Sequence, residues 1–62
     1  MSHNKMYREI KGYEDALYMT YDVINEMEEL QEKIKYGENQ TSVVGKIKEI
    51  ESILAKMKST IS

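Results

Sequence analysis

The stretch DALYMTYDVI, residues 15 to 24, decides the fold of this chain. Seven of its ten residues are apolar, and five of these lie between Asp15 and Asp22. Successive side chains of a helix are rotated by about 100°, so a helix here would be apolar in almost every direction. Its side chains form two stripes, Leu17, Tyr21 and Ile24 in the first and Ala16, Met19 and Val23 in the second. A helix with more than one apolar stripe is buried by more than one neighbour.

The apolar positions around this stretch recur at steps of three and four, which is the helical period. They are Met6, Ile10, Tyr13, Leu17, Tyr21, Ile24, Met27, Leu30 and Ile34. Lysines at 33 and 35 suit the negative end of a helix, and Gly37 suits the left-handed position that follows a helix. The pattern predicts one long amphipathic helix over about 5–36, preceded by a frayed tail at 1–4.

A second, shorter helix is predicted over about 42–59, after a loop at 37–41. Asn39, Thr41 and Ser42 can all serve as N-cap, and Thr41 or Ser42 is the expected one, because the apolar period resumes directly after them. The period alternates steps of four and three through Val43, Ile47, Ile50, Leu54, Met57 and Ile61. A loop of about five residues implies an antiparallel arrangement. We therefore expect a single all-α domain over 1–62, built as a helical hairpin.

Gly12 leaves two interpretations of the first helix. A long helix can tolerate a glycine at a cost of about 1 kcal/mol relative to alanine, and we favour this unbroken helix. Alternatively, a short helix ends at Lys11 and a new one begins, with Glu14 and Asp15 in its favourable first turn.

The unequal lengths of the two predicted helices leave further apolar side chains without a neighbour, in addition to those of the two stripes. The predicted helices would be roughly 45 Å and 27 Å long, so the N-terminal part of the first would overhang. Tyr13 and Leu17 belong to this overhang. The chain has 62 residues and no cysteine, so packing and association must supply its stability. We expect an antiparallel homodimer that forms a two-fold symmetric four-helix bundle, although a different partner protein would meet the same need.

Composition argues against several classes of function. The net charge is −2, and the segment from Glu14 to Glu32 holds seven acids and no lysine or arginine, so direct binding of nucleic acid is not expected. No apolar run approaches the roughly 20 residues of a membrane span, and no secretory signal is recognisable, so a cytoplasmic protein is expected. The single histidine, His3, lies in the predicted tail without partners that could orient it. We expect no enzyme activity, cofactor, metal site or small-molecule substrate.

The five tyrosines and five methionines suggest a protein interface, where both residue types are enriched. The sequence predicts a non-enzymatic protein-interaction module that acts as a small regulator, inhibitor or adaptor. Richness in Lys, Glu, Ile, Asn and Tyr suggests an AT-rich bacterial or phage genome. The predicted interface residues are Tyr7, Ile10, Tyr13, Leu17, Tyr18, Met19, Tyr21, Asp22 and Glu26.

Two alternatives to a regulatory module follow from the same features. In the first, the hairpin is a structural or assembly subunit of a larger complex. The apolar positions at steps of three and four then form its contacts with the other subunits. In the second, the acidic block imitates nucleic-acid phosphate and occupies the basic cleft of a DNA-binding protein.

Overall fold

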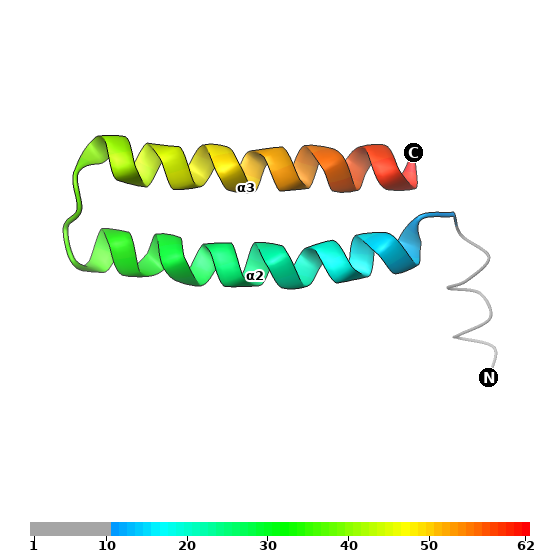
Figure 1. Cartoon of the computed structure of the whole chain (residues 1–62), viewed down its shortest axis with the longest axis horizontal. Helices are drawn as coiled ribbons and strands as arrows, with labels where there is room; N and C mark the ends of the chain where they lie inside the picture. The colour runs from blue at the N-terminus through cyan, green and yellow to red at the C-terminus, as the bar shows by residue number, and fades with distance from the viewer. Residues whose placement is uncertain (1–10) are drawn as a thin grey trace.

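The structure is a computed structural model that describes residues 11–62, and these form two helices packed side by side (Figure 1). Helix α2 covers Tyr13–Lys35 and helix α3 covers Gln40–Ile61. The helices run antiparallel, and no strand occurs among the described residues. The predicted all-α hairpin is therefore confirmed for this part of the chain. The predictions for residues 1–10, including the tail and the interface residues Tyr7 and Ile10, lie outside it.

Helix α2 begins directly after Gly12, which has a φ of 84° in the left-handed region. The favoured prediction of a helix unbroken through Gly12 is wrong, and the alternative of a new helix beginning here is confirmed. A Cβ atom at Gly12 would lie 2.1 Å from the carbonyl oxygen of Thr60, so the chain turns in close contact with the end of α3. Glu14 and Asp15 occupy the first turn of α2, where they favour the positive end of the helix dipole.

Helix α2 ends at Lys35, and Gly37 adopts the left-handed conformation with a φ of 67°, as the sequence predicts. The Gly37 N–H donates to the carbonyl of Ile34 at 3.1 Å, and the Glu38 N–H donates to the carbonyl of Lys33 at 2.9 Å. These two bonds satisfy carbonyl groups that the helix end would otherwise leave unpaired, in the arrangement known as the Schellman motif.

Helix α3 begins earlier than the sequence analysis predicts. Asn39 is the N-cap, and its side-chain oxygen accepts a hydrogen bond from the Ser42 N–H at 2.8 Å. The prediction of Thr41 or Ser42 as N-cap is wrong, because Asn39 comes first along the chain and can already satisfy a free N–H of the first turn. The helix also extends to Ile61, two residues past the predicted end.

The two helices are almost equal in length, with 23 and 22 residues. Each therefore spans about 34 Å, and the predicted lengths of 45 Å and 27 Å are wrong. Gly12 shortens the first helix, and the cap at Asn39 lengthens the second. Because the end of α3 reaches Gly12, α3 runs along the whole of α2, and Tyr13 and Leu17 do not overhang it.

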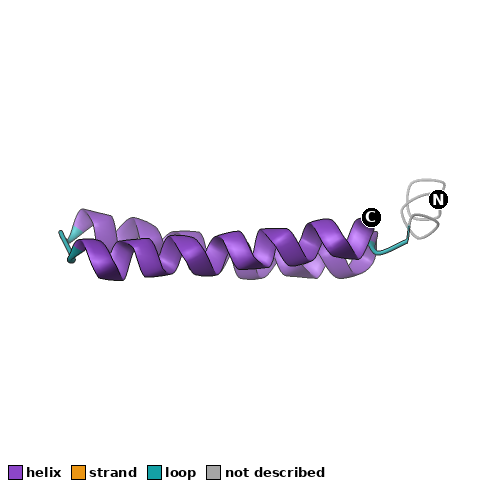
Figure 2. Ribbon diagram, turned by 90° about the horizontal axis from the view of Figure 1, so that it is seen from above, coloured by secondary structure: helices purple, strands orange, loops and turns teal. Residues whose placement is uncertain are grey.

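The hairpin is a single layer of two helices (Figure 2). Within residues 11–62, Ala16 and Ile50 are the only buried apolar residues. Stable domains usually enclose their core between two packed layers. One layer alone leaves a large part of the apolar surface of both helices open.

Candidate protein-binding surface

The contact between α2 and α3 is lined by buried and half-buried residues at steps of three and four. In α2 these are Ala16, Met19, Val23, Glu26, Leu30 and Lys33, and in α3 they are Val43, Lys46, Ile50, Ile53, Met57 and Thr60. These twelve residues form the seam of the hairpin. The second stripe of the stretch 15–24 therefore faces α3, while the first stripe does not.

The residues that directly follow seam residues all lie on one side of the hairpin. One residue corresponds to a rotation of about 100° around a helix axis. Because α2 and α3 face each other and run in opposite directions, this rotation moves the side chains of both helices to the same side. Most of these positions are apolar in both helices, for example Leu17 and Ile24 in α2 and Ile47 and Leu54 in α3.

Ten of the twelve large apolar side chains that are exposed in the described residues lie on this side or, in the case of Tyr21, at the outer edge of α2 beside it. They form what we term the apolar face: Tyr13, Leu17, Tyr21, Ile24, Met27, Ile34, Val44, Ile47, Leu54 and Ile61. Their exposed fractions run from 37% for Val44 to 60% for Ile34. An open furrow of about 460 Å³ follows α2 along this side, lined by residues that include Ile24, Met27 and Ile34.

The charges on and beside the apolar face are balanced. Glu51 and Lys58 each follow a seam residue of α3, and the outer edges of the two helices add two more acids and two more lysines. The full set is Glu14, Glu28, Glu51, Lys35, Lys48 and Lys58. Three acids and three lysines give this side of the hairpin no net charge.

The opposite side of the hairpin carries the residues that directly precede the seam residues. With the exception of Tyr18 they are polar, charged or glycine, and we term them the acidic face: Asp15, Tyr18, Asp22, Asn25, Glu29, Glu32, Ser42, Gly45, Glu49, Ser52, Lys56 and Ser59. Five acids stand against one lysine here, and two of the acids, Glu29 and Glu49, also pair with Lys46 of the seam. A second open hollow, of about 400 Å³, is lined along α2 by acids and one asparagine.

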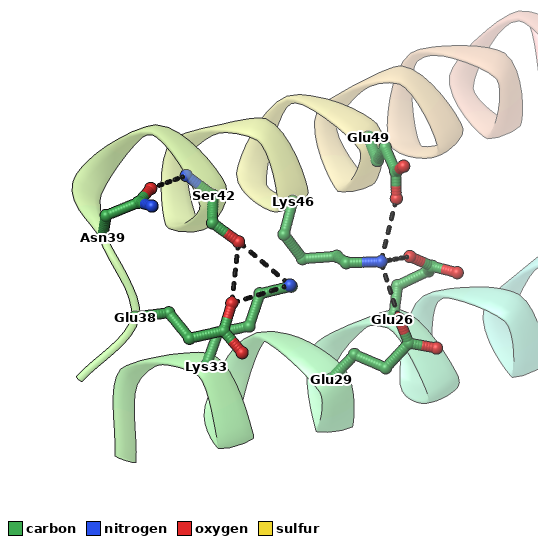
Figure 3. Close-up of polar contacts among 8 residues, drawn as sticks. All are labelled: Glu26, Glu29, Lys33, Glu38, Asn39, Ser42, Lys46 and Glu49. Atoms are coloured by element: carbon green, nitrogen blue, oxygen red, sulfur yellow. Dashed lines mark hydrogen bonds and ion pairs between the residues drawn. The ribbon is translucent and has the colours of Figure 1, made fainter. Parts of the chain in front are cut away.

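Lys46 is the centre of a cluster of ion pairs between the helices (Figure 3). Its Nζ donates to the carboxylates of Glu26 at 2.7 Å, Glu29 at 2.7 Å and Glu49 at 3.0 Å, and its side chain is only 10% exposed. The hydrogen bonds to these three acids raise the pKa of Lys46 above its ordinary value. The hydrogen bond from Lys46 likewise holds the pKa of Glu49 below its ordinary value of 4.5.

A smaller polar cluster closes the loop end of the hairpin. The Ser42 hydroxyl donates to Glu38 at 2.8 Å, and the Nζ of Lys33 donates to both Ser42 and Glu38 at 3.0 and 3.1 Å (Figure 3). The hydrogen bond from Ser42, followed by that from Lys33, lowers the pKa of Glu38. These contacts hold the last turn of α2 against the first turn of α3.

The structure distributes the predicted interface residues over different parts of the hairpin. Met19 and Glu26 belong to the seam, and Glu26 forms an ion pair with Lys46. Tyr18, with an exposed fraction of 63%, and Asp22 lie on the acidic face. The three remaining residues of the set that the structure describes, Tyr13, Leu17 and Tyr21, lie together on the apolar face.

The residues that sequence reasoning missed belong to the apolar face beyond Tyr21. In α2 these are Ile24, Met27 and Ile34, and α3 contributes four more side chains. The signal for them was present as the first stripe of α2 and as the apolar period of α3. The predicted interface lies near the expected overhang, and the nearly equal helix lengths remove that overhang.

Within residues 11–62, no group of three or more His, Cys, Asp or Glu side chains is arranged to hold a metal ion. No helix in the same range is long and apolar enough to cross a membrane. Comparison with family models, with curated proteins and with solved structures finds no match to this chain.

Proposed function

We propose that the chain is a non-enzymatic protein-interaction module, a small regulator, inhibitor or adaptor that acts by binding another protein surface. The observation that carries this proposal is the gathering of ten of the twelve large exposed apolar side chains on one face. Contiguous apolar patches rimmed by polar residues mark interaction sites on protein surfaces. A surface of this length and flatness is suited to a protein rather than to a small molecule, which needs an enclosing pocket.

The pattern of the face favours a helical occupant. Each helix of a four-helix bundle contacts two neighbours and is apolar on about three positions of every seven. Both α2 and α3 have this pattern, because seam residues and apolar-face residues alternate along them, but each has only one neighbour. A pair of helices laid on the apolar face would complete a bundle. A second copy of the chain and a different helical protein both meet this description.

The charges of the acidic face argue against two other occupants. Helices that lie on membrane surfaces usually carry lysine and arginine opposite their apolar side, so that they attract anionic lipid. Here the side opposite the apolar face carries five acids and one lysine, which would repel anionic lipid. The same acids would repel the phosphates of nucleic acid.

The test compares partner capture by the full-length chain with capture by two variants. Leu54→Asp places a charge on the apolar face, and the matched control Ser52→Asp places the same charge on the acidic face of the same helix. We expect the parent chain and Ser52→Asp to retain a stoichiometric protein partner, identified by mass spectrometry, and Leu54→Asp to lose it. Equal retention by all three chains would contradict the proposal. A complex that never exchanges would instead favour the structural-subunit alternative.

A second candidate function is supported by the acidic hollow of α2. Its lining includes Asp22, Glu29 and Glu32 of the acidic face together with Glu26 of the seam and Glu28 of the outer edge, so carboxylates are concentrated along one helix, two of them paired with Lys46. In this alternative the acidic face imitates phosphate and occupies a basic cleft on a DNA-binding protein. Such binding weakens steeply as ionic strength rises. Capture of a partner that is equally strong at low and high salt would exclude it.

A further inference from the structure

We infer that the occupant of the apolar face is a second copy of this chain, related to the first by a two-fold axis that runs parallel to the helices. The two loops then lie at the same end of a four-helix bundle, and α2 of each copy packs against α3 of the other. The two hairpins of this dimer run parallel, which differs from the antiparallel homodimer that the sequence predicts. This inference rests on the proposed function, because it names the partner of the same face.

The first argument is the match of dimensions. The hairpin is one helix layer thick, and its two helices are equal in length within one residue, so a second copy covers the face from end to end. Two helices about 34 Å long and about 10 Å wide present roughly 700 Å². Specific protein interfaces bury about 800 Å² on each partner, so the face has nearly the area that a stable dimer needs.

The second argument is the charge balance of the face. Three acids and three lysines lie on or beside it, while the acidic face opposite has an excess of acids. Two copies that meet through their apolar faces bring surfaces of no net charge together and keep their acidic faces apart. A meeting through the acidic faces would set like charges against each other.

The direction of the axis follows from the level of each charge along the hairpin. Glu26 pairs with Lys46, and Gly12 lies against Thr60, so residues of α2 and α3 whose numbers add up to 72 are level with each other. Rotation about an axis parallel to the helices does not move any residue along the helices. A residue of α2 is therefore level with the same residue of α3 in the second copy as in its own chain. This axis sets Glu14 close to the level of Lys58 of the partner subunit, and Glu28 within about one turn of Lys48 of the partner subunit.

An axis perpendicular to the helices is less favourable. It would pack α3 against α3 of the other copy in reverse direction. Glu51 lies near the middle of α3, which covers Gln40–Ile61, and it follows the seam residue Ile50 onto the side of the apolar face. It would then face its own counterpart close to the axis, and like charges at the centre of an interface are destabilising.

The test is a charge-reversal cycle on the full-length chain, read by sedimentation equilibrium with far-UV circular dichroism on the same samples. Glu28 and Lys48 lie on the outer edges of different helices, so their pairing occurs only between copies. We expect the parent chain to be a helical dimer, and Glu28→Lys and Lys48→Glu each to weaken dimerisation by about tenfold, since each dimer contains two such pairs. The double variant should recover most of the parental affinity.

Two results would overturn the inference. A chain that is helical but monomeric at every concentration excludes the second copy as occupant. If the chain dimerises but the loss of dimerisation affinity in the double variant equals the two losses of the single variants combined, the axis parallel to the helices is excluded. Neither result removes the proposed function, which fails only if Leu54→Asp retains every partner that the parent chain binds.

Discussion

Two glycines show how the same substitution has opposite effects at different positions. Gly12 has a positive φ, and a Cβ atom there would collide with the carbonyl of Thr60, whereas Gly45 lies inside α3 with nothing within 4 Å of its Cβ position. We expect Gly12→Ala to lower the free energy of unfolding by about 1–3 kcal/mol. Gly45→Ala should raise it by about 1 kcal/mol, because alanine is the better helix former. Urea denaturation at one protein concentration measures both, and a stabilised Gly12→Ala chain would contradict the observed turn.

The cap of α3 depends on one side chain. Asn39 accepts a hydrogen bond from the Ser42 N–H at 2.8 Å, and without it this N–H would keep only its longer contact to the Asn39 carbonyl, at 3.1 Å. We expect Asn39→Ala to lower the free energy of unfolding by about 1 kcal/mol, while Asn39→Asp preserves stability because aspartate caps equally well. Thermal unfolding followed by circular dichroism gives both values. If Asn39→Ala matches the parent chain, the N-cap assignment is wrong.

At the scale of the elements, the Lys46 cluster joins α2 to α3 and gives the hairpin a pH dependence. Because the pKa of Glu49 is lowered in the folded chain, its contribution to the free energy of unfolding is fully present above pH 4.5. This contribution is lost as the pH falls through the lower pKa of the folded state. Because the pKa of Lys46 is raised in the folded chain, its contribution to the free energy of unfolding is present below pH 10.5 and is lost only at more alkaline pH. The cluster should therefore stabilise the hairpin throughout the range between these two values.

Lys46→Met tests this dependence directly, with Lys56→Met on the exposed side of the same helix as its matched control. The parent chain and Lys56→Met should lose stability as the pH falls from 6 towards 3. Lys46→Met should be less stable at pH 6, because three neighbouring carboxylates lose their shared cation. It should also lose less stability on acidification, because the hydrogen bond from Lys46 that lowers the pKa of Glu49 is already absent. Parallel pH profiles for all three chains, measured by thermal unfolding, would show that the cluster is unimportant.

Local signals in the sequence predict the elements, but not which sides of them meet. The hairpin, its antiparallel direction and the left-handed Gly37 follow from the apolar period and from short-range turn chemistry. The start of α2 does not, because the contact that shapes Gly12 comes from Thr60, 48 residues later. The choice of seam does not follow either, since both stripes of the stretch 15–24 are apolar. Ion pairs between the helices, such as that of Glu26 with Lys46, form only when the second stripe faces α3. They join residues far apart in the sequence, so local patterns do not predict them.

At the scale of the whole molecule, a chain with two buried apolar residues among those described should gain much of its stability by association. If a second copy covers the apolar face, folding and dimerisation are linked, so the melting temperature Tm depends on concentration. A roughly hundredfold increase in concentration should raise the Tm by about 10 °C for a dimer of this size. Ser52→Asp, on the acidic face, should behave in the same way.

Leu54→Asp, on the apolar face, should melt at a lower temperature that does not depend on concentration, because its charge would have to be buried at the interface between copies. Scanning calorimetry or circular dichroism over the concentration series gives the comparison. A parent chain whose Tm is constant over the series would show that the single layer of two helices is stable alone. The apolar face would then be held open for a different protein.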